Sequence, residues 1–190
     1  IEGPHSVLEG PYGYLRIYEG NYDTREILEG LGKEWHVEGV GHKPYPCGRL
    51  THSAVDAALF SRRSHSIKQD DVAELVVVVP PLVHRLVGRD FSDTQITPQY
   101  AKLSIPYVVA VTLIRGKVNL LDFSADALSD QVVGSLAKRV KVILDDGNRD
   151  ENAMGPVDLR IRMGNGIEYS MEVPQAQGSP GNPLTRAQQL

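Results

Sequence analysis

The feature that most constrains the fold of this chain is a pair of short segments near its C-terminal end. These segments, VDLRIRM at 157–163 and IEYSMEV at 167–173, flank Gly164, Asn165 and Gly166. Asparagine and glycine adopt the backbone conformations that tight two-residue turns require, so this order predicts a β-hairpin. The chain must therefore fold around at least one antiparallel pair of strands.

Further strands and helices are predicted on the N-terminal side of this hairpin. Strands are predicted at WHVEGV (35–40), AELVVVVP (73–80) and RVKVILDD (139–146). Helices are predicted at 23–30 with Asp23 as N-cap, at 50–64, at 98–115, and at 125–140 with Ser124 as N-cap. Within 98–115, Pro106 either kinks the helix or lies in its first turn. This mixture predicts an α+β fold in which helices pack on a mixed or antiparallel sheet.

The composition excludes several classes of protein. A formal net charge of -4, without a long run of one sign, gives no electrostatic footprint for nucleic acid or an anionic membrane. The single cysteine, Cys47, excludes an internal disulfide and favours a reducing compartment. The longest apolar run, LVVVV at 75–79, is too short to span a bilayer. We therefore expect a soluble, cytoplasmic protein.

The stretch HKPYPCGRLTH at 42–52 concentrates groups that bind anions or move protons. Pro44 and Pro46 fix their own φ angles and push the preceding residues toward extended geometry, so the stretch is stiff. The spacing of His42, Cys47 and His52 fits none of the usual structural zinc patterns, and no metal site is predicted.

Two interpretations of this stretch remain open on spacing alone. In the functional one, Lys43 and His52 lie at opposite ends of one loop, and the helix that begins near Arg49 points N–H donors at a carboxylate-bearing substrate. In the structural one, Lys43 is solvated, Tyr45 packs, Arg49 pairs with a surface carboxylate and His52 is a satisfied helix residue. Spacing by itself favours the structural interpretation.

Four segments carry a resemblance to a known family. They are GPHSVLEGPYGYLR, LGKEWHVEGVGHKPYPCGRLTHSAVDA, AKLSIPYVVAVTLIRGKV and GSPGNPLT. Their order resembles the C-terminal half of the MmgE/PrpD family, which includes 2-methylcitrate dehydratase, cis-aconitate decarboxylase and iminodisuccinate epimerase. The resemblance covers essentially the whole chain.

The resemblance implies a domain organisation. In the family, a large all-helical domain carries a smaller α+β lid, and the active site lies between the two. Residues 21–178 are then expected to form the lid, while residues 1–20 and 179–190 are stubs of the helical domain. The N-terminal helical domain is expected to be a missing partner, and the full-length protein is expected to be a homodimer.

The resemblance also implies a site and a reaction. It assigns catalytic roles to Lys43, Tyr107 and His52. It assigns substrate binding to Arg49, Gly48 and Ser104. Family members act without a cofactor on small di- or tricarboxylates. Decarboxylase members tend to have histidine at the position of Gly48, which favours elimination of water as in 2-methylcitrate dehydratase.

Alternatives to this reaction stay open. A decarboxylase or an epimerase of the same family would use the same lid. A non-catalytic binding domain that kept the fold is a further possibility, because the histidine- and aspartate-bearing helical segments of the family are absent from this sequence. The main proton-transfer group is accordingly expected outside this chain, which by itself should be nearly inactive.

Overall fold

A computed structural model of the chain describes residues 3, 5–92 and 96–189. The chain divides into two units, Ile1–Gly39 and Val40–Leu190, which are described separately. None of the described helices is both long enough and apolar enough to cross a membrane.

The unit Ile1–Gly39 contains short helices with little burial. These are α1 (Tyr14–Tyr18), α2 (Thr24–Leu28) and the 3₁₀ turn η1 (His36–Gly39), and none of them has a buried residue. Asp23 caps α2 as predicted, because its side chain accepts a hydrogen bond from the Arg25 N–H at 2.9 Å. The predicted strand at 35–40 is wrong: its residues turn within η1 instead of pairing with a second strand.

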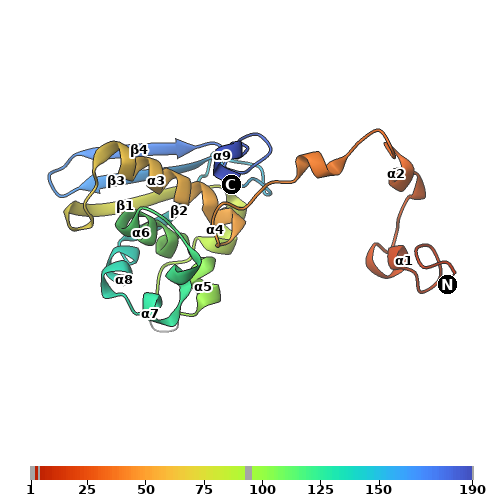
Figure 1. Cartoon of the computed structure of the whole chain (residues 1–190), viewed down its shortest axis with the longest axis horizontal. Helices are drawn as coiled ribbons and strands as arrows, with labels where there is room; N and C mark the ends of the chain where they lie inside the picture. The colour runs from red at the N-terminus through yellow and green to blue at the C-terminus, as the bar shows by residue number, and fades with distance from the viewer. Residues whose placement is uncertain (1–2, 4, 93–95, 190) are drawn as a thin grey trace. The chain divides into compact units, whose positions relative to one another are not determined.

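The unit Val40–Leu190 is built on a four-stranded mixed sheet (Figure 1). Its strands are β1 (Val72–Val79), β2 (Val140–Leu144), β3 (Val157–Met163) and β4 (Glu168–Val173), in the order β2-β1-β3-β4. The predicted hairpin is confirmed as the antiparallel pair β3–β4, and β3 also pairs antiparallel with β1. In contrast, β1 pairs with β2 in parallel. The α+β class with a mixed sheet is thereby confirmed.

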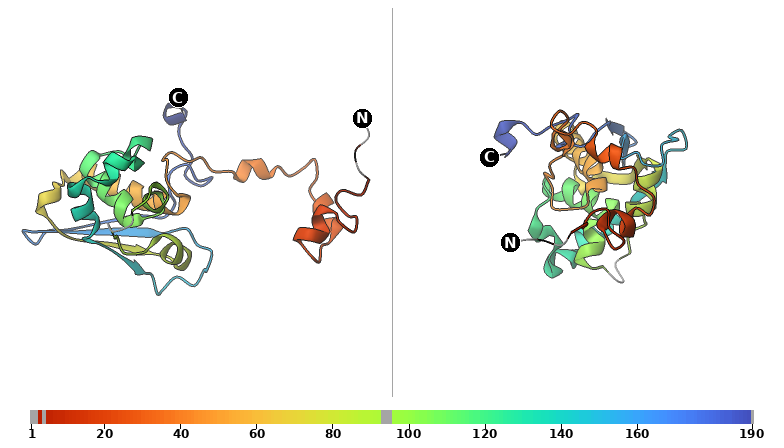
Figure 2. Two further views of the ribbon diagram at one scale, coloured as in Figure 1. Left: turned by 90° about the horizontal axis from the view of Figure 1, so that it is seen from below. Right: turned by 90° about the vertical axis from the view of Figure 1, so that its right-hand side faces the viewer.

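Helices cover one face of this sheet (Figure 2). Here α3 (His52–His65) contacts β3 and β4, α6 (Ile105–Arg115) contacts β2, and α8 (Gln131–Ala137) packs on α6. Leu75, Val77 and Val79 of β1 are fully buried, whereas Val76 and Val78 between them are half-buried. The period of two along a strand explains this alternation, because alternate side chains point to the face that α3 and α6 cover.

Smaller elements connect these parts. They are η2 (Arg49–Thr51), η3 (Gln69–Asp71), α4 (Pro81–Val87), α5 (Pro98–Lys102), η4 (Leu120–Phe123), α7 (Ala125–Leu128) and α9 (Arg186–Gln189). Of these, η2 leads directly into α3, and α4, which follows β1, contacts η2. The loop before α3 therefore lies close to the end of β1.

Two helices predicted as continuous are each broken in the structure. The segment 98–115 forms α5 and α6, because Ser104 caps α6 and Pro106 lies in its first turn. This decides between the two places predicted for Pro106. The segment 125–140 forms α7 and α8, since Asp130 accepts hydrogen bonds from two N–H groups of the second helix.

Candidate functional site

The proline loop, which we define as residues 42–49, lies against the end of α5. The Gly48 N–H donates a hydrogen bond to the Lys102 carbonyl at 2.8 Å. Cys47 is buried, and its sulfur lies 3.2 Å from the Thr51 hydroxyl. Because the prolines of the loop also fix its backbone, these contacts hold the loop in one arrangement at the start of α3.

The proline loop and α5 border a hollow of about 600 Å³. Its volume lies in the range of small-molecule sites. It is lined by Lys43, Pro44, Tyr45, Pro46, Cys47, Gly48, Gln99, Lys102 and Leu103. Two lysines and no aspartate or glutamate occur among these lining residues. The hollow is therefore suited to a small anion.

Gly48 lets the loop approach α5 closely. A Cβ atom at this position would lie 2.6 Å from Cδ2 of Leu103 and 3.3 Å from the Lys102 carbonyl oxygen. The side-chain atom can move, but the carbonyl belongs to the backbone that Gly48 also binds. A larger residue at position 48 would therefore reduce the space between the loop and α5.

His52, the first residue of α3, is fully buried beneath the proline loop. Its Nε2 lies 3.3 Å from the Cys47 carbonyl, and its Nδ1 has no hydrogen-bond partner among the described residues. Burial, helped by the positive charges of Arg49 and Lys43, outweighs the opposing effect of the Cys47 hydrogen bond and lowers the pKa of His52 to about 4. The imidazole is thus neutral near pH 7, with Nε2–H donating to the carbonyl and Nδ1 left as an acceptor.

Ser104 and Tyr107 lie in the core. The Ser104 side chain accepts a hydrogen bond from the Tyr107 N–H at 3.3 Å and so caps α6. The Tyr107 ring is 1% exposed, and its hydroxyl donates to the Asp122 carbonyl at 2.6 Å. Burial raises the pKa of Tyr107 to about 12. Neither residue lines the hollow.

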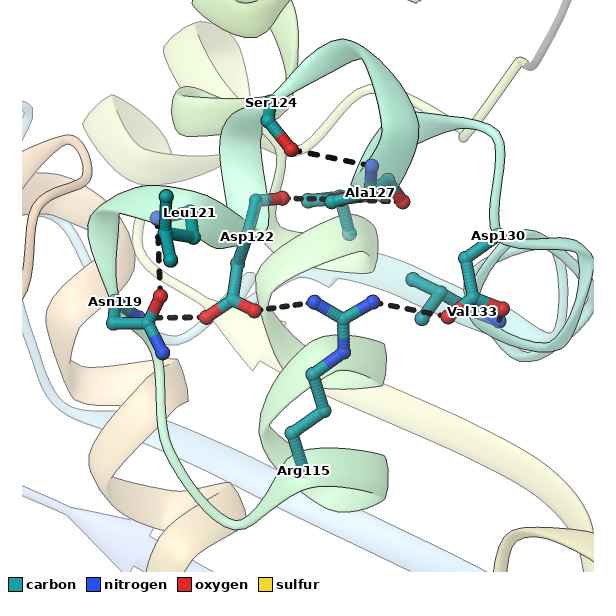
Figure 3. A network of polar contacts seen from close by, with 9 residues as sticks. Arg115, Asn119, Leu121, Asp122, Ser124, Ala127, Asp130 and Val133 are labelled. Atoms are coloured by element: carbon teal, nitrogen blue, oxygen red, sulfur yellow. Dashed lines mark hydrogen bonds and ion pairs between the residues drawn. The ribbon is translucent and has the colours of Figure 1, made fainter.

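The Asp122 carbonyl, which accepts the hydrogen bond from Tyr107, belongs to a segment held by ion pairs. Figure 3 shows this network around Arg115, Asp122 and Asp130. Arg115 at the end of α6 pairs with Asp122, and with Asp130 at 2.9 Å. The Asp122 side chain also accepts a hydrogen bond from the Asn119 N–H at 2.7 Å. The network therefore connects α6, η4 and the start of α8 around the hydroxyl of Tyr107.

Comparison with known proteins identifies the family of this chain. The sequence profile of the MmgE/PrpD C-terminal domain matches residues 45–190. This chain belongs to the MmgE/PrpD family. The match confirms the resemblance found from the four sequence segments.

Two similar members of the MmgE/PrpD family are cis-aconitate decarboxylases of Aspergillus terreus. One, from strain NIH 2624 / FGSC A1156, is 25% identical over 192 residues, which cover 93% of this chain and 39% of that protein. The other is 26% identical over 196 residues, which cover 94% of this chain and 40% of that protein. The chain thus spans about two fifths of the length of these relatives, and it corresponds to the C-terminal portion of the family.

Arg49 connects this MmgE/PrpD domain's proline loop to its C-terminal segment. It is half-buried, and its guanidinium donates a hydrogen bond to the Ser179 hydroxyl. That hydroxyl donates in turn to the Ala176 carbonyl at 2.6 Å. Arg49 does not line the hollow, so its predicted contact with a substrate stays a prediction.

The structure brings two of the predicted site residues, Lys43 and Gly48, to the hollow of this MmgE/PrpD domain. The others lie in the loop base and the core; they are Arg49, His52, Ser104 and Tyr107. In the described part of the chain, no three His, Cys, Asp or Glu side chains gather in a way that could hold a metal ion. The assigned roles of all these residues remain predictions.

Lys102 and Gln99 line the hollow but were not predicted. The Lys102 ammonium lies 5.7 Å from the centre of the Phe123 ring, within the range of a cation–π contact. A signal for Lys102 was present in the sequence: Ser104 followed by Pro106 marks a new helix start, so the preceding residues form a helix end. Only the fold shows that this helix end lies beside the proline loop.

Proposed function

We propose that this chain supplies the substrate-binding lid of a cofactor-independent lyase that acts on small di- or tricarboxylates. The supporting observation is the hollow lined by Lys43 and Lys102, with no carboxylate among its described lining residues. Each ammonium group can hold one carboxylate of a substrate that carries two or three.

The same charges favour the chemistry as well as binding. Elimination of water next to a carboxylate removes a proton from carbon and breaks the C–O bond on the neighbouring carbon, so the hydroxyl leaves as water once it is protonated. The negative charge that develops spreads onto a carboxylate that is already anionic. Fixed cations beside that carboxylate stabilise this charge and so lower the barrier. Such electrostatic stabilisation is often the largest single contribution to catalysis.

The remaining residues have supporting roles in this proposal. His52 orients the loop through the Cys47 carbonyl, and Arg49 holds the loop to the C-terminal segment. Tyr107 is proposed as a hydrogen-bond or proton donor, which requires its hydroxyl to leave the Asp122 carbonyl. Ser104 would act by capping the helix that carries Tyr107.

Decarboxylation is a second candidate reaction. The two Aspergillus terreus relatives are named cis-aconitate decarboxylases, and both are similar to this chain over nearly its whole length. Loss of carbon dioxide also leaves negative charge next to carboxylates, so the two lysines would serve it equally. The glycine at position 48, where decarboxylases tend to have histidine, is the reason for proposing elimination of water first.

The main proton-transfer group is proposed to lie in the helical domain that precedes this C-terminal portion in longer family members. We further propose that the complete enzyme is a homodimer. The opposing interpretation is a non-catalytic binding domain of the same fold.

A titration with citrate and 2-methylcitrate tests the binding part of the proposal. We expect Lys43→Met and Lys102→Met each to weaken binding by about tenfold, the loss expected for one charge-assisted hydrogen bond. Lys68→Met is the matched control, because Lys68 is exposed and does not line the hollow. Unchanged affinity in Lys43→Met would remove this lysine from the site.

Turnover by the protein that includes the helical domain tests the reaction. Water elimination predicts consumption of 2-methylcitrate without release of carbon dioxide, whereas decarboxylation predicts release of carbon dioxide from cis-aconitate. Tight binding without turnover of either compound, or of citrate or iminodisuccinate, would favour the non-catalytic domain.

A further inference from the structure

Asp56 of α3 is a buried carboxylate that the proposed function does not use. It is 2% exposed. Its Oδ1 accepts a hydrogen bond from the Tyr45 hydroxyl, and its Oδ2 accepts one from the Gln177 N–H at 2.7 Å. One side chain therefore joins the proline loop to a segment near the C-terminus of the chain.

That C-terminal segment, which we call the tail turn and define as residues 175–182, also contacts the loop directly. The His42 N–H donates a hydrogen bond to the Gly178 carbonyl at 2.7 Å, and Arg49 donates to the Ser179 hydroxyl. The tail turn thus contacts both ends of the proline loop directly. The Asp56 carboxylate adds a third connection, between Tyr45 in the middle of the loop and Gln177 of the tail turn.

The contact at Gly178 is too close for any other residue. Gly178 has a φ of +83°, and a Cβ atom there would lie 2.4 Å from the His42 carbonyl oxygen. Glycine alone accepts both the left-handed conformation and this approach. The sequence of the tail turn is therefore fitted to the backbone of the loop.

The two hydrogen bonds of Asp56 are of the strong kind. A buried carboxylate is stable only when donors occupy its oxygens, and hydrogen bonds to a charged acceptor are about twice as strong as neutral ones. Burial raises the pKa of Asp56, while the hydrogen bonds from Tyr45 and Gln177 and the positive charge of Arg49 oppose this shift and favour the ionised form. Removing either donor leaves an oxygen of this carboxylate without its partner, which weakens the hold on the other segment.

Lys43 lies two residues before Tyr45, with Pro44 between them. Because proline has a fixed φ angle and restricts the residue before it, the direction of Lys43 follows the position of Tyr45. The Tyr45 ring also lies edge-on to the His52 ring, with 5.2 Å between centroids. The position of Lys43 beside the hollow therefore depends on where Tyr45 is held.

We propose that Asp56 is a positioning residue that couples the tail turn to the proline loop and thereby sets Lys43 at the hollow. Its consequence for the substrate rests on the proposed function above, whereas the coupling between loop and tail turn does not. The two parts therefore have separate tests.

Amide hydrogen exchange of the 190-residue chain tests the coupling. Tyr45→Phe removes one hydroxyl in the loop but keeps the ring, and we expect the Gln177 amide in the tail turn to exchange about fivefold faster, as expected for the weakening of one hydrogen bond. Asp56→Ala should have at least this effect. Asp56→Asn should retain protection, because its oxygen can accept from Gln177 while its amide donates to Tyr45.

The control for this experiment is Tyr169→Phe on β4, where the ring stacks on His65 at 4.0 Å. It should leave exchange in the tail turn unchanged. If Asp56→Ala fails to fold, Tyr45→Phe decides alone. Unchanged exchange of Gln177 in Tyr45→Phe, or equal acceleration in the control, would overturn the coupling.

Kinetics of the longer enzyme test the positioning role. Tyr45→Phe should raise KM for a tricarboxylate about fivefold with a smaller change in kcat, because it displaces a carboxylate-binding group. Asp56→Asn, which can still form both hydrogen bonds, should keep KM within about twofold of the value for the unsubstituted enzyme. The positioning role would be overturned if Tyr45→Phe lowered kcat without raising KM, or if Asp56→Asn raised KM as much as Tyr45→Phe. If the unsubstituted enzyme binds no polycarboxylate, the proposed function fails, while the exchange result still decides the coupling.

Discussion

Replacing His52 with glutamine should remove most of the acid sensitivity that this imidazole gives to the unit Val40–Leu190. His52 is fully buried and neutral in the folded chain, with a pKa of about 4. In the unfolded chain its pKa returns to the ordinary 6.5. The folded protein therefore cannot take up a proton that the unfolded protein binds readily.

The magnitude follows from this difference in pKa. Because the folded pKa is the lower one, the stability associated with His52 is fully present above about pH 6.5 and is lost as the pH falls toward about 4. Each unit of pKa difference is worth about 1.4 kcal/mol, so the free energy of unfolding should fall by about 3 kcal/mol across this window from His52 alone.

Urea unfolding at several values between about pH 7 and pH 4 measures this effect. The signal should be far-ultraviolet circular dichroism, because the single tryptophan, Trp35, lies in the other unit. Glutamine is chosen because its amide can still donate to the Cys47 carbonyl but does not titrate. The difference between the two proteins at each pH cancels the contributions of carboxylates common to both.

Two outcomes would refute this reasoning. One is a pair of parallel curves, in which the difference between the two proteins changes by less than about 1 kcal/mol from pH 7 to pH 4. The other is an equal change in the control His65→Gln, since His65 is exposed at the end of α3.

Two further substitutions, each compared with a control variant, test the packing that positions the site. Gly178→Ala should lower the free energy of unfolding by about 2–3 kcal/mol, and Gly166→Ala by about 1 kcal/mol, because both have positive φ but only Gly178 has a backbone atom in the way. Urea unfolding measures both, and equal costs would contradict the clash. Arg115→Leu leaves the buried Asp122 carboxylate without its cation and should lower the free energy of unfolding by about 3 kcal/mol. The control Arg160→Leu, which removes the exposed ion pair with Asp158, should lower it by less than about 1 kcal/mol. Similar melting temperatures of these two variants would show that the Arg115 network is not needed for stability.

Several elements were predictable because their signals are local. The hairpin β3–β4 follows from an Asn-Gly turn between two strand-like segments, and β1 follows from its β-branched run. Ser124 caps α7 as predicted, accepting a hydrogen bond from the Ala127 N–H at 3.3 Å. Each of these signals depends on interactions among a few neighbouring residues, which can form whatever the rest of the fold is.

Other predictions were wrong because a local sequence pattern does not decide the structure of those segments. The segment 35–40 has strand-like composition, but a strand also needs a partner for its backbone groups, and the segment forms the turn η1 instead. The breaks inside 98–115 and 125–140 depend on caps at Ser104 and Asp130 that compete with a continuous apolar pattern. A periodic pattern shows which residues will be buried but not where a helix ends.

The candidate site shows the same division. Lys43 and Gly48 were predicted from the stiff, cation-bearing loop and lie at the hollow. Lys102 was missed because it is more than fifty residues away in the sequence and reaches the hollow only through the backbone contact between its carbonyl and Gly48.

The sequence by itself determined the strands of the four-stranded sheet, the caps at Asp23 and Ser124, the α+β class and the family, because turn residues, these caps and the motifs each depend on residues close together in the sequence. Only the tertiary structure decided the strand order, the parallel pairing of β1 with β2, and the junction of Asp56 with Tyr45 and Gln177. These features join residues far apart in the chain. Their stability comes from packing and hydrogen bonds that exist only after the intervening segments have folded.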